Sequence, residues 1–301
     1  MIELKNELSG YFTVSKGTDP DNMVEVASFP NLITDAGLLM YGASSDFIRY
    51  CNIGSSSTTP TVSDTTLINR LYYSESALSE NTGANNTNPN ARYVYRRRTM
   101  RFTPKGVPYT IAEVGFGWNT TGSVFNRALV VDGGGSPTTI SVLDNEYIDI
   151  TYELRLYPPT TDSTGTLTPT GKDVVPRNWT ARAAGDSGNI SYYVFGWSLG
   201  GGPGLQSLTA YRDNIGTLFS TPTGYVGSAN TAGSYTINPV IPEITYSRKF
   251  ELTEGNDALG IKSLLATGYG YYYQIGFDAP FMKTNTDEIT FTFKISWGRR
   301  P

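Results

Sequence analysis

The chain of 301 residues contains no histidine and a single cysteine, Cys51. The missing histidine excludes a Ser-His-Asp triad, a Cys-His pair and any histidine-based zinc or iron site. The single cysteine excludes an intrachain disulfide and a zinc ribbon. Catalysis would therefore need carboxylates, tyrosines or lysines, and paired carboxylates cannot be located from spacing alone in a β protein. We predict no catalytic residue and no cofactor.

Two short acidic stretches carry oxygen ligands that suit a calcium ion, Asp19-Pro-Asp-Asn22 and Asp144-Asn-Glu146. Neither has the spacing of an EF-hand loop, and Asp and Asn side chains form turns without a metal. Ordinary turns are the better interpretation, so no metal site is predicted. The stretch Gly200-Gly-Gly-Pro-Gly204 lacks the Lys-Ser/Thr pair of a phosphate-binding loop, and we interpret it as a loop.

Arginines gather in one predicted strand. Side chains alternate between the two faces of a strand, so Arg96 and Arg98 lie on one face. Arg97 and Arg101 lie on the other face. One interpretation is an interface where these guanidinium groups meet carboxylates of a neighbouring chain. The alternative is a solvated strand end whose arginine stems lie on aromatic rings. The candidate interface residues are Arg92, Arg96, Arg97, Arg98 and Arg101.

Tyr269, Tyr271 and Tyr273 alternate onto the face that carries Ile275 and Phe277. Tyrosines in such a row can bind a glycan or form an interface. More often they form the rim of a core, and we favour that interpretation.

Antiparallel strands would have to position these residues. The segments 112–118, 123–130 and 146–157 are rich in apolar residues that alternate with polar ones or with glycine. The last is the clearest, because such a long alternation predicts a strand with one packed face and one wet face. Its expected core residues are Ile148, Ile150, Tyr152, Leu154 and Leu156.

The composition also favours strands and turns, with 32 Gly, 17 Pro and 21 Tyr and only 17% charged residues. One helix is expected within residues 29–40, with Thr34 or Asp35 as its N-cap. The net charge of −4 does not indicate a nucleic-acid or anionic-membrane binder. No segment has the length of a signal peptide or a membrane span, so we expect a soluble protein made in a cytoplasm.

The predicted fold is all-β, with two antiparallel β-sandwich (jelly-roll-like) domains. The N-terminal domain covers residues 1–157 and the C-terminal domain residues 174–301. A Thr- and Pro-rich linker, residues 158–173, is expected to lack regular secondary structure. The Asn-rich stretch at residues 80–90 is expected to be an exposed, mobile loop. Strand patterns recur in both halves at unequal offsets, which fits either related domains or two unrelated sandwiches.

Several segments resemble a family of tailed-bacteriophage virion proteins found at the tail tip, baseplate or fibre attachment site. The resemblance covers roughly the first half of the chain and includes no catalytic motif. It implies a non-enzymatic structural component that assembles as a symmetric oligomer. The matching segments are residues 29–38, 51–60, 63–67, 112–118, 125–129 and 147–157.

The leading functional hypothesis is therefore a virion protein, synthesised in the host cytoplasm, whose first domain docks into the particle. Its expected partners are copies of itself, as a trimer or hexamer, and other virion proteins. The alternative is a carbohydrate- or receptor-binding module that contacts a host surface glycan. A carboxylate-based hydrolase is the third hypothesis. No nucleic-acid partner and no membrane insertion are predicted.

Overall fold

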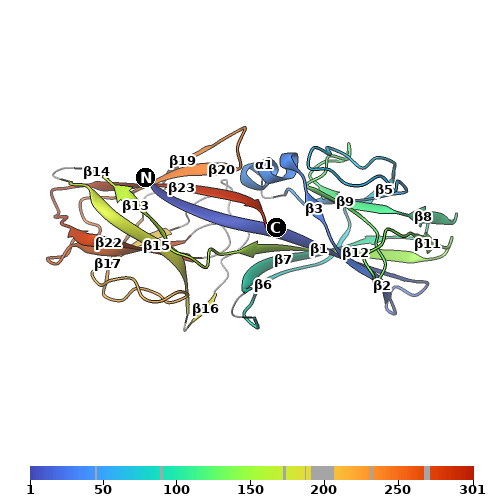
Figure 1. Cartoon of the computed structure of the whole chain (residues 1–301), viewed down its shortest axis with the longest axis horizontal. Coiled ribbons are helices and arrows are strands. Elements are labelled where there is room, and N and C mark those ends of the chain that lie inside the picture. The colour runs from blue at the N-terminus through green and yellow to red at the C-terminus, as the bar shows by residue number, and fades with distance from the viewer. Residues whose placement is uncertain are drawn as a thin grey trace. The chain divides into compact units, whose positions relative to one another are not determined.

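The structure is a computed structural model that describes the chain except for residues 45, 89–90, 172–173, 187, 191–206, 231–232 and 268–271. Strands dominate the described residues (Figure 1), and the one helix among them is α1 (Asp35–Ala43). The predicted all-β fold is confirmed. Within the described ranges, no helix has the length and apolar character needed to cross a membrane.

The largest sheet contains β1 (Ile2–Gly17), β2 (Val24–Pro30), β6 (Ala77–Asn85), β7 (Tyr93–Phe102), β12 (Tyr147–Tyr157), β14 (Thr170–Gly171), β19 (Ser234–Ile237), β20 (Glu243–Phe250) and β23 (Ile289–Arg299). Its hydrogen-bonded order is β19-β20-β23-β1-β12-β7-β6, with β2 beside β1 and β14 beside β23.

Three further sheets complete the fold. The five-stranded sheet has the order β3-β10-β9-β4-β5, and β11 pairs with β8. These strands are β3 (Leu32–Ile33), β4 (Tyr50–Gly54), β5 (Arg70–Ser74), β8 (Tyr109–Ile111), β9 (Glu113–Gly117), β10 (Asn126–Leu129) and β11 (Ile140–Val142). The seven-stranded sheet contains β13 (Ser163–Leu167), β15 (Arg177–Asp186), β16 (Asn189–Ile190), β17 (Ser207–Tyr211), β18 (Tyr225–Ala229), β21 (Ile261–Thr267) and β22 (Tyr272–Phe281). Its order is β13-β15-β22-β21-β17-β18, with β16 beside β15.

The chain forms two compact units, and neither is continuous in sequence. Unit 1 contains Met1–Glu7, Gly83–Val94 and Leu156–Gly298. Unit 2 contains Leu8–Thr82, Tyr95–Arg155 and Arg299–Pro301. Strands such as β1 and β12 therefore contribute residues to both units.

The core of unit 2 lies between two sheets. The predicted core face of β12 is confirmed, because all five of its apolar residues are fully buried. The prediction that the opposite face is wet is wrong in part, because Asp149 and Glu153 on that face are each 7% exposed. The ring of Tyr152 in β12 packs 5.1 Å from that of Phe12 in β1. It also lies 5.4 Å from the ring of Phe116 in β9, which belongs to the five-stranded sheet. Aromatic pairs at these distances join the sheets into a sandwich.

The helix begins where the sequence predicts. Thr34 is its N-cap, and Oγ1 of Thr34 accepts a hydrogen bond from the backbone N–H of Gly37 at 2.9 Å. The same hydroxyl donates to the carbonyl oxygen of Val124 at 2.9 Å. This N-cap therefore fixes the helix to the chain that leads into β10.

The core of unit 1 is also an aromatic contact between sheets. Phe291 of β23 stacks on Phe277 of β22 with ring centroids 5.8 Å apart. The ring of Phe281, at the end of β22, lies edge-on to the ring of Phe291, with the two centroids 5.6 Å apart. Both units are thus two-layered, as the sandwich prediction requires.

Two predictions about irregular segments are wrong. The expected linker contains β13, which pairs with β15, and β14, which pairs with β23. The expected loop at residues 80–90 is half strand, because β6 continues to Asn85. In both cases the backbone completes the edge of a sheet, and threonine suits a strand even without apolar neighbours. The predicted strand at residues 191–197 and the glycine-rich loop that follows it lie outside the described residues.

Cys51 is fully buried in β4, and burial raises the pKa of its thiol. A raised pKa keeps the sulfur protonated and weakly nucleophilic at neutral pH. The residue therefore acts as a small apolar side chain of the core.

Lys283, which is 3% exposed, organises the loop between β20 and β21. Its Nζ donates to the carbonyl oxygen of Glu251 at 2.6 Å and to Oδ1 of Asn256 at 2.9 Å. Burial lowers the pKa of this ammonium group. We expect Lys283→Met to lower the free energy of unfolding by about 1–3 kcal/mol, because buried oxygens lose their donor. Urea denaturation measures this loss, and the exposed Lys5→Met is the matched control. Equal stability of the two variants would show that the ammonium does not hold the loop.

Candidate functional site

The arginine-rich strand is β7, and its burial alternates as predicted. Arg96 and Arg98 lie on the buried face, 0% and 7% exposed. Nε of Arg96 donates to Oε1 of Glu80 at 2.7 Å. Burial lowers the pKa of Arg96 to about 10, although the Glu80 carboxylate opposes this change. Arg98 donates from Nη1 to the carbonyl oxygen of Ile48 at 3.0 Å, so both groups are internal cations of unit 2.

Arg97 and Arg101, on the outward face, meet carboxylates of the same chain. Arg97 donates from Nε to Oε2 of Glu153 at 3.0 Å, and its Nη2 donates to the same oxygen. Arg101 donates from Nε and Nη2 to the two oxygens of Asp149, at 2.8 and 2.7 Å. These bonds raise the pKa of Arg101. Arg97 and Arg101 therefore have carboxylate partners within their own chain.

The fifth arginine, Arg92, belongs to unit 1, where its guanidinium carbon lies 4.8 Å from the ring centroid of Phe219. The other four belong to unit 2. The structure thus gives the five arginines different surroundings, and an interface role for any of them stays a prediction.

Tyr273 is fully buried, and its hydroxyl donates to Oδ1 of Asn6. It is a core residue and offers no face to a glycan, which agrees with the favoured interpretation. Tyr269 and Tyr271 lie outside the described residues.

The acidic stretches close turns with their own oxygens. Oδ1 of Asp19 accepts from the backbone N–H of Asp21 at 3.0 Å, and Oδ2 accepts from Nδ2 of Asn22 at 2.5 Å. Oε2 of Glu146 accepts from the backbone N–H of Leu143 at 2.7 Å. Within the part of the chain that the structure describes, no group of three or more acidic or cysteine side chains could hold a metal ion.

Unit 2 contains an ionic cluster that was not predicted from the sequence. This cluster, the Arg127 network, consists of Arg127, Glu113 and Asp64. Arg127 in β10 and Glu113 in β9 are both fully buried. Nε of Arg127 donates to Oε2 of Glu113 at 2.8 Å, and Nη1 donates to Oδ2 of Asp64 at 2.7 Å. Nη2 donates to the carbonyl oxygen of Thr58 at 2.7 Å. Three branches of one guanidinium therefore join two strands to the chain between β4 and β5.

The Arg127 network fixes residues 55–69, which connect β4 to β5. Oε1 of Glu113 accepts from the backbone N–H of Asn69 at 2.8 Å, and Oε2 accepts from that of Ile68 at 3.2 Å. These bonds satisfy backbone donors that a sheet would otherwise pair. The connection is therefore held in one conformation although it has little regular structure.

A signal for this network exists in the sequence. Glu113 and Arg127 are the only charged residues in segments 112–118 and 123–130, whose other residues are uncharged and mostly apolar or glycine. A charge at such a position has to be paired, because burying it alone is costly.

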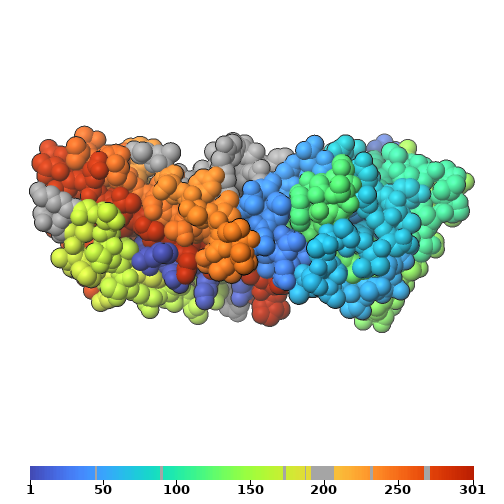
Figure 2. All heavy atoms as spheres, turned by 90° about the horizontal axis from the view of Figure 1, so that it is seen from above, coloured from blue at the N-terminus to red at the C-terminus, as the bar shows by residue number. Residues whose placement is uncertain are grey.

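The turn between β9 and β10 fits into the same region. Figure 2 shows its bright green atoms lying among the blue and cyan atoms of earlier parts of unit 2. Nη1 of Arg70 donates to the carbonyl oxygen of Thr120 at 2.8 Å. Ser123 forms a bridge with Thr66 in the fixed connection. The network and this turn thus make one continuous structural block.

The Asp64 carboxylate makes the stability of unit 2 depend on pH. Burial alone would raise its pKa, but hydrogen bonds from Thr61 and Arg127 outweigh burial and lower the pKa below 3.8. A lowered pKa in the folded state contributes stability above the unfolded value, and that stability is lost as the pH falls through the folded value.

We therefore expect Asp64→Asn to reduce stability at neutral pH and to flatten the loss of stability below about pH 4. Urea midpoints measured from neutral to acidic pH test this expectation. Asp144→Asn, at an exposed turn residue, is the control. A variant whose midpoints fall with acid as steeply as those of the wild type would contradict it.

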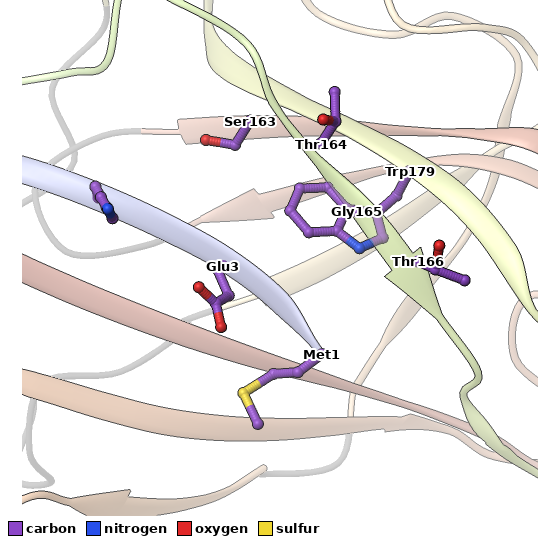
Figure 3. Close-up of a pocket in the computed structure, with 8 residues that line it drawn as sticks. Met1, Glu3, Ser163, Thr164, Gly165, Thr166 and Trp179 are labelled. Atoms are coloured by element: carbon purple, nitrogen blue, oxygen red, sulfur yellow. The ribbon is translucent and has the colours of Figure 1, made fainter.

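Unit 1 contains a pocket of about 380 Å³ between β1 and β13. Figure 3 shows the indole of Trp179 beside Gly165, with Glu3 of β1 and the preceding Met1 nearby. A Cβ atom at Gly165 would lie closer than 3.0 Å to the indole, so any larger residue at this position would clash with the Trp179 ring. Trp179 is 4% exposed, and its buried Nε1 has no hydrogen-bond partner. A hydrogen-bond acceptor that entered this pocket would satisfy the indole N–H.

No protein-family model, curated protein or solved structure matches the chain. A function therefore has to be inferred from the contacts within each unit. Two features of unit 2 bear on it: the Arg127 network, and a polar groove across the outer face of its largest sheet.

Proposed function

We propose that the chain is a non-enzymatic structural component of a bacteriophage tail, at the tail tip, baseplate or fibre attachment site. It assembles there as a symmetric oligomer and contacts other virion proteins. The observation that carries this proposal is the Arg127 network, because it is built from segments that resemble such proteins. In this proposal the residues of the network keep a binding surface in one conformation and take no part in a chemical reaction.

The energetic character of the network supports a structural role. A buried ion pair adds little net stability, because the desolvation of both charges offsets most of their attraction. What it provides is a unique arrangement, since any displaced partner would leave a buried charge unpaired. A connection that has to dock in one geometry benefits from such a constraint.

The fixed connection presents apolar side chains to solvent. Val62 is 41% exposed and Ile68 is 54% exposed, on either side of the anchored Asp64. Their backbones are held, because the carbonyl oxygen of Val62 accepts from the N–H of Asp35 at 2.8 Å and the N–H of Ile68 is bonded to Glu113. Apolar side chains on an ordered backbone lose little entropy when a partner covers them. We infer that this connection is a docking surface for a neighbouring subunit.

The test is the double variant Val62→Ser and Ile68→Ser. Both side chains are exposed, so the fold should keep its stability within about 0.5 kcal/mol. We expect light scattering to show an oligomer for the wild type and a smaller species for the variant. Incorporation into particles, followed with an antibody to the chain, should fall in parallel.

Val175→Ser with Leu259→Ser is the matched control, because these residues of unit 1 are 46% and 63% exposed. A wild-type protein that stays monomeric and never enters particles would refute the proposed function. Normal assembly of the Val62 and Ile68 variant would remove only this connection from the interface.

A further inference from the structure

The polar groove of unit 2 crosses the outer face of five neighbouring strands, β6, β7, β12, β1 and β2. Its cavity volume is about 540 Å³. Every residue that lines it is polar, charged or tyrosine. A concave, polar sheet face of this size has room for a ligand that makes many hydrogen bonds.

Each of the five strands contributes one serine or threonine side chain to the groove. Oγ1 of Thr99 lies 2.8 Å from that of Thr151, and Oγ1 of Thr13 lies 3.4 Å from Oγ of Ser28. Adjacent strands are about 4.8 Å apart, so five strands spread these hydroxyl groups over a width that can contact several sugar units of an extended polysaccharide. A hydroxyl both donates and accepts, as a sugar hydroxyl does. In sheet order this hydroxyl row is Ser79, Thr99, Thr151, Thr13 and Ser28.

Beside the hydroxyl row lies an ionic group with an excess of positive charge. Arg97 and Arg155 both donate to Glu153, with Nε of Arg155 lying 2.7 Å from Oε1. Burial would raise the pKa of Glu153, but the two guanidinium groups outweigh it and lower that pKa. Glu153 is therefore ionised at neutral pH, and the three side chains together carry one net positive charge. The Arg97 side chain is 44% exposed, within reach of a ligand.

We propose that this groove binds an acidic polysaccharide. Its sugar hydroxyls bond to the hydroxyl row, and a carboxylate of the uronic or sialic type faces Arg97. This site is independent of the assembly role proposed above. Glu153 in the groove disfavours a densely charged polymer such as a nucleic acid, whose affinity depends on many phosphate contacts. A polymer with at most one carboxylate per sugar unit matches the single excess charge.

The test uses calorimetric titration with acidic oligosaccharides: trigalacturonate, triguluronate, a hyaluronan tetrasaccharide and trisialic acid. Methyl-esterified trigalacturonate and maltotriose are the neutral counterparts. We expect at least one acidic member to bind, and its neutral form to bind about tenfold more weakly, because a charge-assisted bond is lost.

Two variants locate the binding in the groove. Thr99→Val with Thr151→Val removes two hydroxyls and keeps residues that suit a strand, so affinity should fall about tenfold with the fold intact. Arg97→Gln should weaken the acidic ligand and leave the weak neutral binding unchanged. Thr292→Val with Ser247→Ala removes a similar hydroxyl pair, 3.1 Å apart, from unit 1 and should change nothing.

Failure of every acidic member to bind at millimolar concentration would overturn the proposal. The proposal would also be overturned if the methyl ester, inorganic phosphate or a short RNA bound with the same affinity as the acidic oligosaccharide. Unchanged affinity in the Thr99 and Thr151 variant would also overturn it. Particle incorporation of these variants should remain normal, which separates this test from that of the assembly role.

Discussion

Arg127→Met is expected to lower the free energy of unfolding by about 3–5 kcal/mol, measured by urea denaturation. Glu113 is fully buried beside Arg127, and the substitution removes the charge that compensates it. The carbonyl oxygen of Thr58 and Oδ2 of Asp64 lose a donor at the same time. A loss of this size is a large part of the stability of an ordinary domain.

The double variant Arg127→Met with Glu113→Gln should recover part of this loss, because no buried charge is left unpaired. Arg49→Met is the matched control, since the Arg49 side chain is 50% exposed and its ion-pair distances are 3.7 and 4.0 Å. An exposed pair of this kind contributes at most about 1 kcal/mol. If Arg127→Met were no more harmful than Arg49→Met, the network would not hold the connection.

The elements that sequence predicts well are those in which local pattern and burial agree. The alternation of Ile148 to Leu156 appears unchanged as the buried face of β12. Thr34 caps the helix through a bond to Gly37, only three residues away. Both features depend on short-range geometry, which a single sequence contains.

The strands that sequence does not predict are polar ones at the edges of sheets. Leu167 is the one apolar residue in Ser163-Thr-Gly-Thr-Leu167 and does not by itself indicate β13, yet the backbone of β13 pairs with Arg177–Ala181 of β15. β6 is a similar case, because its first five residues are exposed. Such strands form because a neighbour offers free backbone groups, and that neighbour is distant in sequence.

The same distinction applies to the candidate site. Alternation correctly predicts which arginines of β7 share a face, but their partners come from elsewhere in the chain. Arg97 pairs with a residue 56 positions away, and Arg101 with one 48 positions away. Pairing across a sheet depends on register, which alternation does not determine. The partners of these arginines within the chain therefore could not be identified without the fold.

Gly37→Ala is expected to destabilise unit 2 although it lies in helix α1. Replacing a helical glycine by alanine normally adds about 0.5–1 kcal/mol of stability. At Gly37, however, a Cβ atom would lie closer than 3.0 Å to the backbone carbonyl of Phe125. Backbone cannot yield as a flexible side chain does, and overpacking of this kind costs about 1–3 kcal/mol or more. We expect a net loss of about 1–2 kcal/mol in urea denaturation, because the clash outweighs the gain in helix propensity.

Gly133→Ala separates the two effects. An added Cβ there meets nothing within 4 Å, and the residue is exposed in a turn. The change in unfolding free energy of Gly133→Ala therefore reflects only the reduced conformational freedom of the unfolded chain. This effect stabilises the alanine variant or leaves its stability unchanged. Opposite signs for the two variants would show that contact with β10 requires glycine at position 37. If Gly37→Ala were instead stabilising, the helix would have to move away from the chain entering β10. The Thr34 cap, which bonds both Gly37 and the carbonyl oxygen of Val124, would then have to break or shift with it.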